Sequence, residues 1–448
     1  MTFKLIKLDS SRNMGVLFKV PGVRLVSLIM VSIMLLISGS GVTAIGAGSA
    51  PDVEWDKRFG RKLADRGAFV QQTRDGGYIV TGSTASFYMH GRGDSDVYLL
   101  KVDATGTKEW DKTYGGAGYE EGRCVQQTSD EGYIMVGTTR SFSSQRHNQV
   151  FLVRTDAAGQ RQWQKTLGDD GEYTGMFVQE IRDGGFIIVG SYDKFGDGRT
   201  SLYLARTRPN GAVVWEKTVG GQGIQRGSCV RPTSDGGFIV VGATSSRGGG
   251  GLDVYLVKTD GDGRVEWEKT FGGQGDDEGF SLHETGDGGW IIAGQTFSSG
   301  HRSSDVYLLK VDEMGNLEWE KAIGGAGWEV GYSVWPAVDG GYVVVGVKNS
   351  PGADYDIYVV KTDASGQLLW EKTLGEKGCD EAYCIQQTDD GGYIVVGWTN
   401  SFGPNRIWDY QKKYDYDDVY LIKLKPEGES LVADGFSGSR GEGSLSRH

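Results

Sequence analysis

Carboxylate side chains gather in short segments along the chain, and these are the first residues that suggest chemistry. The densest segment holds Asp276, Asp277 and Glu278. Comparable segments hold Glu120, Glu121, Asp169, Asp170, Glu172, Glu329, Asp380 and Glu381. Hard cations such as Ca²⁺ need several converging oxygens. We therefore treat Asp276, Asp277 and Glu278 as a candidate calcium site, with an ordinary solvated turn as the alternative.

A second set of candidate residues is aromatic and lies in one long segment, residues 401–420. It holds Trp408, Tyr410, Tyr414 and Tyr416 beside Arg406. Aromatic rings with adjacent polar groups suit sugar rings or a protein surface. We interpret the segment as a candidate ligand-binding surface, and a cover that protects the rim of the fold is the alternative.

Catalytic patterns are missing from the sequence. The five histidines are scattered, and neither HExxH nor GxSxG occurs. No serine, cysteine or carboxylate pair stands out for nucleophilic or acid–base work. The sequence therefore favours binding over catalysis.

The elements that must position these residues repeat along the chain. The stretch "TRDGGYIVTG" (residues 73–82) has six near-copies, among them "TSDEGYIMVG" and "TSDGGFIVVG". A tryptophan also recurs, and the spacings between its copies, 51 to 55 residues, are the same as those between the copies of this stretch. The tryptophans are Trp55, Trp110, Trp163, Trp215, Trp267, Trp319 and Trp370. A third marker resembling "DVYLLKVD" also occurs seven times. Internal repetition is therefore the first fact about the fold.

Each repeat predicts four short strands, because Val-, Ile-, Tyr- and Thr-rich runs alternate with Gly and Asp clusters. Seven such units predict an all-β, seven-bladed β-propeller. The first Trp strand, residues 53–59, precedes any other strand, and the last unit lacks a Trp strand. We therefore expect the N-terminal strand to complete the last blade and close the ring. An open β-solenoid is the alternative.

Several recurring residues predict scaffold roles. In the "DGG" turn, we expect the Asp to accept backbone N–H bonds and the second Gly to adopt a positive φ. The Trp should dock between blades. Lysines of "WxK", such as Lys269 and Lys372, should pair with the Asp that begins the third strand, such as Asp253. Cys124, Cys229 and Cys384 occupy one equivalent position and should be small core residues, whereas Cys379 and Cys384 are close enough for a disulfide.

The turns divide between two faces of the predicted ring. The strand one–two and three–four turns are nearly invariant, whereas the strand two–three loops and the links between blades vary. The variable face is our site hypothesis. His283 is a further candidate ligand-binding residue, since it occupies a first-strand position shared by Gln71, Gln126, Gln179, Arg231, Trp335 and Gln386. This set predicts either a polar channel lining or hydrogen bonds between blades.

The chain ends differ from the repeats. Residues 1–50 contain a basic flank, an apolar run at 25–37 and a small-residue stretch, which is typical of a signal peptide and leader. We expect the propeller at 51–425 and a disordered tail at 426–448. Membrane contact is expected only if the signal segment stays uncleaved. The protein should be secreted, periplasmic or at the cell surface, and its net charge of −12 disfavours a nucleic-acid partner.

The repeat "DGGYIVVG…DVYLVKTD…WEKTFGG" resembles the repeats of secreted bacterial and archaeal β-propeller proteins. The segment "KVDATGTKEW" (residues 101–110) is also similar to the tryptophan-docking repeats of quinoprotein-like propellers, which include PQQ-dependent dehydrogenases. The resemblance covers residues 53–424 and implies the fold. Seven units rather than eight, and no adjacent cysteine pair, argue against PQQ as a cofactor.

These observations favour an exported propeller that binds a glycan or a protein partner through its variable face. The alternatives are a propeller enzyme, either a glycan hydrolase or lyase or a quinoprotein-like oxidoreductase, and a passive structural protein of the envelope. The sequence does not indicate an oligomeric state.

Overall fold

The computed structural model describes residues 49–60, 63–85, 95–143, 147–194, 196, 198–220, 223–300, 303–349, 354–401 and 417–428. Every described residue belongs to one compact unit within Ala47–His448. Over the described ranges, the only regular elements are β-strands. These ranges contain no helix that is long and apolar enough to cross a membrane.

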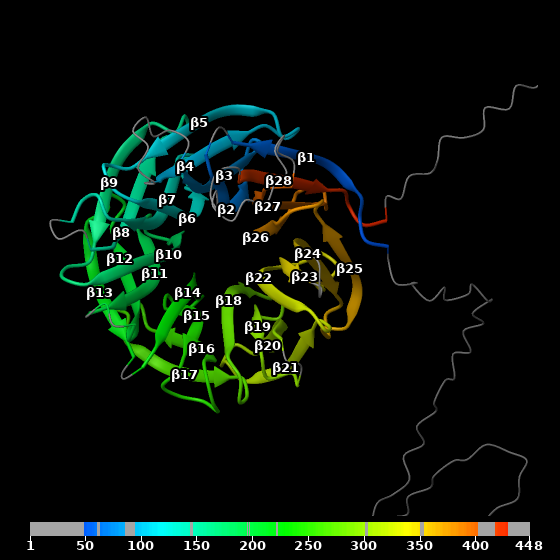
Figure 1. Cartoon of the computed structure of the whole chain (residues 1–448). Helices are drawn as coiled ribbons and strands as arrows, with labels where there is room; N and C mark the ends of the chain where they lie inside the picture. Colours follow the sequence, from blue (N-terminus) through cyan, green and yellow to red (C-terminus); the bar gives the residue numbers. More distant parts are fainter. Residues whose placement is uncertain are drawn as a thin grey trace, which may run out of the picture. The chain divides into compact units, whose positions relative to one another are not determined.

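The described strands form seven four-stranded antiparallel sheets arranged as a ring (Figure 1). From the centre outward, blade 1 has β2 (Asp65–Gln72), β3 (Tyr78–Thr84), β4 (Asp96–Val102) and β5 (Lys108–Tyr114). Blade 2 has β6 (Glu120–Gln127), β7 (Tyr133–Thr139), β8 (Gln149–Thr155) and β9 (Arg161–Leu167). Blade 3 has β10 (Glu172–Glu180), β11 (Phe186–Asp193), β12 (Thr200–Thr207) and β13 (Val213–Val219).

The remaining blades follow the same order. Blade 4 has β14 (Gln225–Pro232), β15 (Phe238–Thr244), β16 (Asp253–Thr259) and β17 (Val265–Phe271). Blade 5 has β18 (Asp277–Glu284), β19 (Trp290–Thr296), β20 (Asp305–Val311) and β21 (Leu317–Ile323). Blade 6 has β22 (Trp328–Pro336), β23 (Tyr342–Asn349), β24 (Tyr355–Thr362) and β25 (Leu368–Leu374). Blade 7 has β26 (Asp380–Gln387), β27 (Tyr393–Thr399), β28 (Asp418–Leu424) and, from the other end of the chain, β1 (Val53–Phe59).

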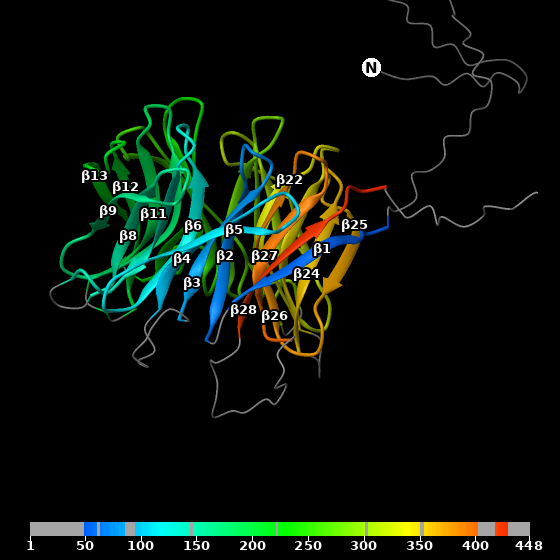
Figure 2. The same ribbon diagram turned by 90° about the horizontal axis from the view of Figure 1, so that it is seen from above.

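The ring is closed by the N-terminal strand, as the sequence predicted. β1 pairs antiparallel with β28, with Val53 opposite Leu424 and Phe59 opposite Val419. The Lys425 N–H also donates to the Asp52 carbonyl at 3.0 Å. Figure 2 shows β1 lying along β28. The prediction of a closed, all-β, seven-bladed propeller is confirmed, because the outer edge of blade 7 is paired within the chain.

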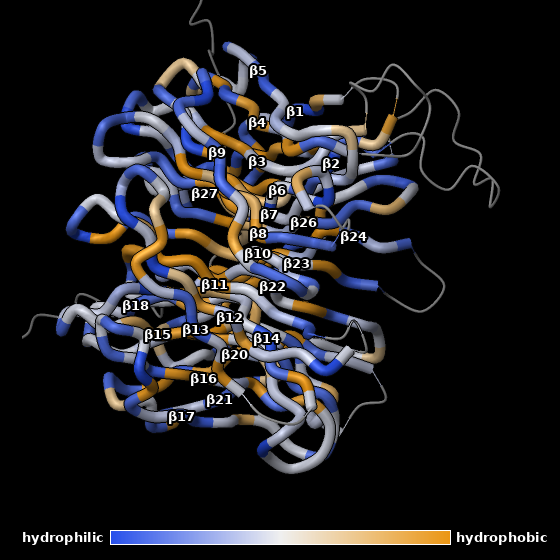
Figure 3. The backbone as a smooth tube through the Cα atoms, turned by 90° about the vertical axis from the view of Figure 1, so that its left-hand side faces the viewer, coloured by the Kyte–Doolittle hydropathy of each residue, from blue (hydrophilic) through white to orange (hydrophobic). Residues whose placement is uncertain are grey.

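The core lies between the blades. Every residue of β15 and β16 is buried, and the hydrophobic stretches run along such strands in Figure 3. A strand that is covered on both faces needs apolar residues on both, which explains the continuous apolar runs of the sequence. Glycines in the first strands bring the blades close: a Cβ at Gly279 would lie 2.6 Å from Val241 of the preceding blade.

The recurring tryptophans dock on the next blade, as predicted. The rings of Trp55, Trp110, Trp163, Trp215, Trp267 and Trp319 each lie against a glycine in the three–four turn of the following blade. The Trp215 indole also donates to the Gly261 carbonyl at 3.2 Å. Trp370 faces the closing blade, and its indole donates to Glu427 at 3.2 Å. These contacts bury large aromatic surfaces between the blades.

One detail of the "DGG" turn corrects the sequence analysis. Asp75 accepts bonds from the Gly77 N–H, at 3.0 Å, and from the Thr73 hydroxyl, as predicted. The positive φ belongs to the first glycine, Gly76, at 83°, and Glu131 adopts 69° in the unit that reads "DEG". The second glycine is invariant for a steric reason, because a Cβ at Gly77 would overlap the Val102 carbonyl oxygen.

The predicted ion pairs of the "WxK" lysines are wrong. Lys269 donates to Asn316 at 3.3 Å and Lys372 donates to the Pro51 carbonyl at 2.8 Å. The cation that forms an ion pair is instead the Lys or Arg near the end of each third strand. It binds the "DGG" aspartate of its own blade, in the pairs Lys101–Asp75, Arg154–Asp130, Arg206–Asp183, Lys258–Asp235, Lys310–Asp287, Lys361–Asp339 and Lys423–Asp390.

All four cysteines are buried free thiols, so Cys379 and Cys384 do not form a disulfide. The Cys229 thiol faces the Leu282 carbonyl of the next blade at 3.8 Å, and the Cys384 thiol faces the Val70 carbonyl at 3.5 Å. Burial raises the pKa of the Cys384 thiol to about 12. Cys124, Cys229 and Cys384 are therefore core residues that contact the neighbouring blade, as predicted, and their protonated form is unreactive.

Candidate functional site

Three aromatic rings form a continuous series on the innermost strands of blades 5, 6 and 7. The rings of Phe280 and Tyr332 are 5.5 Å apart, and those of Tyr332 and Tyr383 are 5.1 Å apart. The Tyr383 hydroxyl accepts a hydrogen bond from the Trp398 indole at 3.1 Å. We call Phe280, Tyr332, Tyr383 and Trp398 the aromatic arc. Its first three rings are partly buried, so each keeps some surface for contact.

Charged groups flank the aromatic arc. Glu381 accepts the Tyr383 hydroxyl at 2.6 Å. The Arg66 guanidinium lies 4.7 Å from the centre of the Trp398 ring and forms an ion pair with Asp417 at 2.6 Å. Glu278 accepts a bond from Gln295 at 2.9 Å, and burial raises the pKa of its carboxyl. Burial and the negative charges of Glu381 and Glu278 also raise the pKa of Tyr332, so both carboxylates lie near this ring.

The position of the arc follows from strand register. Phe280, Tyr332 and Tyr383 each follow a glycine or alanine that recurs at the same first-strand position in every repeat. At this point the pairing of the first strand with the second strand shifts by one residue. The extra residue of such a bulge is left out of the ladder, which re-aims its side chain. This point lies in the half of the first strand nearest the links between blades. The arc therefore belongs to the face with variable loops.

The sequence analysis missed these three residues, although a signal was present. The equivalent position holds Ala68, Arg123, Met176 and Ser228 in blades 1 to 4. Aromatic residues at one otherwise variable position in three successive repeats stand out against a scaffold that is nearly invariant elsewhere. Variation at a fixed position within a repeat is thus the pattern that identifies this surface.

His283 lies at the opposite half of its strand, close to the "DGG" turn. Its ring packs 4.5 Å from the Trp335 ring, and Nδ1 lies 3.1 Å from the Glu284 carbonyl. Burial lowers its pKa to about 4, with a smaller effect from the Arg231 charge. A neutral, packed imidazole of this kind suits a structural role, and His283 does not contact the aromatic arc in any ring pair of the described residues.

The residues equivalent to His283 connect neighbouring blades. Gln71 accepts the Gln127 N–H at 2.7 Å, and Gln386 accepts the Gln72 N–H at 2.7 Å. Arg231 donates to the Gln179 side chain at 3.1 Å. Of the two interpretations of this set, hydrogen bonding between blades is therefore the one that these contacts support.

The candidate calcium residues have separate partners. Asp276 accepts the Leu252 N–H at 2.8 Å and is exposed. Asp277 is fully buried and accepts the Gly273 N–H and the Ser298 hydroxyl, both at 2.7 Å. Glu278 faces the aromatic arc. Across the described ranges, no group of three or more His, Cys, Asp or Glu side chains is gathered as a metal site.

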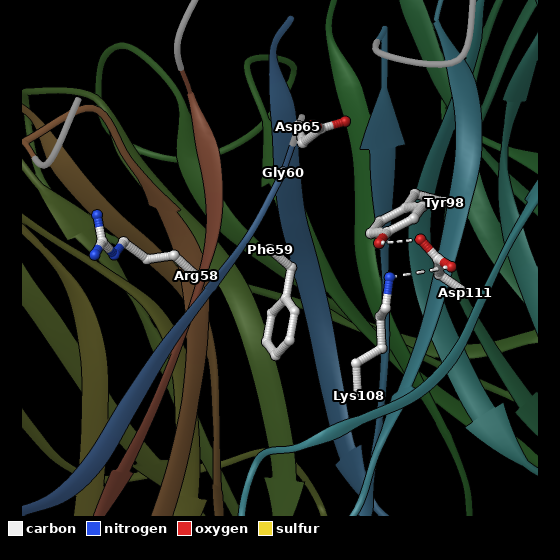
Figure 4. A pocket seen from close by; sticks show the side chains of 7 residues that line it. All are labelled: Arg58, Phe59, Gly60, Asp65, Tyr98, Lys108 and Asp111. Carbon is white, nitrogen blue, oxygen red and sulfur yellow. Dashed lines mark hydrogen bonds and ion pairs between the residues drawn. The ribbon is translucent and has the colours of Figure 1, made fainter. Parts of the chain in front are cut away.

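Two small cavities lie at equivalent places between blades. The cavity between blades 7 and 1 has a volume of about 200 Å³ and is lined by Arg58, Phe59, Gly60, Asp65, Tyr98, Lys108 and Asp111. In Figure 4, Asp111 accepts the Tyr98 hydroxyl and pairs with Lys108, at 3.1 and 3.4 Å. The other cavity, of about 150 Å³, is lined by Gly220, Gln225, Thr244, Ser246, Arg247, Tyr255 and Glu268. Their repetition indicates a feature of the blade junction rather than one dedicated pocket.

The predicted aromatic insertion lies outside the described residues. This applies to Arg406, Trp408, Tyr410, Tyr414 and Tyr416, which all fall within residues 402–416. Their proposed role in ligand binding stays a prediction. The described residue next to this segment, Asp417, is the one that pairs with Arg66 beside the arc.

Comparisons with known proteins agree on the fold. No protein-family model matches the chain, and no curated protein matches it. The solved structure of the polysaccharide lyase Uly1 is 11% identical, covers 82% of this chain and 91% of its own, and superposes with a TM-score of 0.51. A protein of unknown function from Dyadobacter fermentans is 11% identical, with 84% and 100% coverage and a TM-score of 0.48. YCF48 bound to D1 peptide is 10% identical, with 85% and 99% coverage and a TM-score of 0.46.

At these identities the likeness concerns the fold alone, because propellers carry many unrelated functions. The strand topology makes the described part of the chain a seven-bladed β-propeller, and the likeness to the Uly1 structure concerns that fold alone. Its resemblance to secreted propeller repeats and to quinoprotein-like propellers in particular stays a prediction.

Proposed function

We propose that this propeller is an exported binding module and that it holds a glycan chain against the aromatic arc. The observation that carries the proposal is the unbroken series of Phe280, Tyr332 and Tyr383 across three blades. Three rings of this kind form an extended, curved surface, which suits a chain-like ligand better than a compact one.

The chemistry around the rings favours a carbohydrate. The apolar faces of sugar rings pack on aromatic side chains, and their hydroxyls need charged or amide partners at the edge. Glu278, Glu381 and Arg66 supply acceptors and a donor beside the rings. The Arg66 charge is shared with Asp417, so neutral or weakly acidic glycans fit best.

The test compares two matched aromatic substitutions in the full chain. Tyr332→Ala should weaken glycan binding at least 10-fold, because alanine removes the central ring and about 1.5 kcal/mol or more of contact energy. Phe142→Ala is the control: Phe142 is 42% exposed in the loop after β7 of blade 2, on the same face but away from the arc. Binding would be screened on a glycan array and quantified by calorimetry.

The outcomes separate the ligand classes. Equal loss in both variants would point to the loops in general rather than to the arc. Binding to no glycan, with capture of a defined surface protein that Tyr332→Ala abolishes, would make the arc a protein-binding surface. A wild-type protein that binds neither would reject the proposal.

One observation favours an enzyme as the second candidate. Glu278 is a carboxyl with a raised pKa beside the arc, and such a group can act as a general acid on a glycosidic oxygen. A glycan hydrolase or lyase would then release shorter products from a bound glycan. Glu278→Gln should abolish that release without abolishing binding, which end-group analysis would detect.

The proposed location rests on the sequence of residues 1–50, which resembles a signal peptide. Expression of the full chain in a bacterial host, followed by fractionation and determination of the N-terminal residue, tests it. We expect the processed protein outside the cytoplasm, with an N-terminus between residues 45 and 51. An unprocessed cytoplasmic chain would contradict this.

A further inference from the structure

Five of the seven junctions between blades bring two carboxylates together. One comes from the start of a third strand and the other from the start of the next blade's first strand. The pairs are Asp96 with Glu120, Asp253 with Asp277, Asp305 with Glu329, Asp356 with Asp380, and Asp418 with Asp65. In each junction, a Cβ added to the glycine after the fourth strand would contact oxygens of both acids. The paired carboxylates are therefore a recurring feature of the junction between blades.

Two of these pairs, at Gly272 and Gly375, show the arrangement clearly. At Gly272, the position of an added Cβ is 2.5 Å from Asp277 Oδ2 and 2.8 Å from Asp253 Oδ1. At Gly375, the corresponding distances are 2.6 Å to Asp380 Oδ2 and 2.7 Å to Asp356 Oδ1. Asp277 and Asp380 are both 0% exposed. Two carboxylates this close, one of them fully buried, repel each other strongly in a low-dielectric surrounding.

Hydrogen-bond donors at these junctions point at one oxygen of each buried acid. Asp277 Oδ2 accepts the Gly273 N–H and the Ser298 hydroxyl. Asp380 Oδ2 accepts the Glu376 N–H at 3.0 Å and the Ser401 hydroxyl at 2.6 Å. One oxygen of each buried acid therefore has its partners within the protein.

The second oxygen of each buried acid still needs a partner. Asp277 Oδ1 and Asp380 Oδ1 are buried and have no hydrogen-bond partner among the described residues. No basic side chain of the described part pairs with either acid. A metal cation can bind several oxygens at once and needs no proton to do so, and it therefore suits these paired carboxylates.

We propose that the Asp253–Asp277 and Asp356–Asp380 junctions each bind one divalent, oxygen-preferring cation, with Ca²⁺ as the best match. The carboxylates of adjacent blades bridge the ion, and water and backbone oxygens complete its shell. Ca²⁺ accepts this flexible arrangement more readily than Mg²⁺, which demands a near-octahedral shell. Only two carboxylates contribute, so the affinity falls in the range of about 10⁻⁴ to 10⁻³ M that is typical of extracellular modules.

Small cavities occur at two equivalent junctions elsewhere in the ring. The two cavities described above, of about 200 and 150 Å³, lie beside the equivalent glycines Gly60 and Gly220 of other junctions. The bound ion would link blade 4 to blade 5 and blade 6 to blade 7. This role differs from the predicted site of Asp276, Asp277 and Glu278, since it uses only Asp277 from that set and draws its second ligand from the preceding blade.

The experiment measures Ca²⁺ binding and thermal unfolding of the full chain at pH 7.5. Equilibrium dialysis against CaCl₂ up to about 10 mM should give bound ions at the expected weak affinity, and Ca²⁺ should raise Tm by several degrees over a chelated sample. Asp277→Asn and Asp380→Asn should each remove one bound ion. In chelator, neither variant should be less stable than wild type, because each removes a repulsion.

Asp262→Asn is the matched control, since Asp262 is an exposed turn residue paired with Arg264. It should leave both bound ions and the Tm shift unchanged. A wild-type Tm that neither Ca²⁺ nor Mg²⁺ moves would overturn the proposal without any variant. Ion binding that survives the double variant Asp277→Asn/Asp380→Asn would equally reject these junctions as the sites.

Discussion

At the scale of single residues, the cation near the end of each third strand, buried in six of the seven blades, is the most consistent feature of the fold. Lys361 is 0% exposed, and its ammonium contacts the Asp339 carboxylate and the Thr362 carbonyl. The same arrangement around Lys310 and Thr285 holds the pKa of Asp287 at about 2, first through the Thr285 hydroxyl and then through the Gly289 N–H and Lys310. The pair pins the "DGG" turn to the third strand.

Lys361→Met should destabilise the protein by roughly 1–3 kcal/mol. Methionine fills most of the space, so the loss reports the ion pair and not a cavity. The figure stays below that of a wholly buried pair, because the Asp339 side chain is 49% exposed and can be hydrated. Urea unfolding followed by tryptophan fluorescence measures it. Lys377→Met, at an exposed position, should change stability by less than about 0.5 kcal/mol.

The Asp96 carboxyl gives a pH dependence of definite sign. Burial, with a contribution from the Glu120 charge, raises its pKa from 3.8 to about 6. A raised carboxyl pKa contributes stability that is fully present below 3.8 and is lost as the pH rises through 6. In chelator, Asp96→Asn should therefore be more stable than wild type at pH 8 by about 1–2 kcal/mol.

That difference should shrink as the pH falls toward 4, because Asp96 is then protonated and resembles asparagine. Thermal unfolding of both proteins from pH 4 to 8 measures the trend. A constant difference across this range would contradict the assigned pKa.

At the scale of elements, the turns show why glycine recurs in two adjacent positions for two different reasons. The first glycine of "DGG" supplies the left-handed conformation, and the second leaves room for a carbonyl oxygen. Only the second reason forbids every side chain, which explains why Glu131 is tolerated at the first position.

Gly289→Ala should therefore cost about 2 kcal/mol or more, since its Cβ would overlap the Val311 carbonyl. Gly286→Ala, three residues earlier in the same turn region, meets nothing within 4 Å and has no positive φ, so it should change stability by less than about 0.5 kcal/mol. Chemical denaturation of the two variants makes the comparison. Equal effects would show that backbone flexibility, not contact, explains the invariant glycine.

At the scale of the whole molecule, stability depends on closing the ring. β1 contributes the outer strand of blade 7, and Trp55 on it also contacts Tyr78 of blade 1, with ring centres 5.9 Å apart. A chain that lacks residues 49–59 would expose the edge of β28 and uncover blade 1.

We expect this deletion to lower Tm by more than about 10 °C and to cause self-association, because an unpaired strand edge accepts strands from other molecules. Size-exclusion chromatography with light scattering, together with calorimetry, tests both effects. Supplying a synthetic peptide of residues 49–60 should reverse the association. A monomeric, equally stable truncated chain would show that the ring does not need this strand.

The sequence alone determined the architecture. Seven copies of a four-strand pattern and the Trp strand split between the two ends specify a closed seven-bladed ring, since only that arrangement pairs every strand. Trp docking also followed, because a large aromatic residue at a fixed repeat position must be buried by a neighbouring repeat.

Only the tertiary structure decided which side chains meet across blades. Phe280, Tyr332 and Tyr383 are about 50 residues apart in sequence, and the two acids of each junction pair are at least 20 residues apart. A periodic pattern assigns positions to such residues but does not say which of them are in contact. The same limit misassigned the lysine partners and the positive φ. Repetition fixes the backbone, including the bulge that recurs in every first strand, whereas the residue type at each position and the packing of neighbouring blades decide which side chains meet.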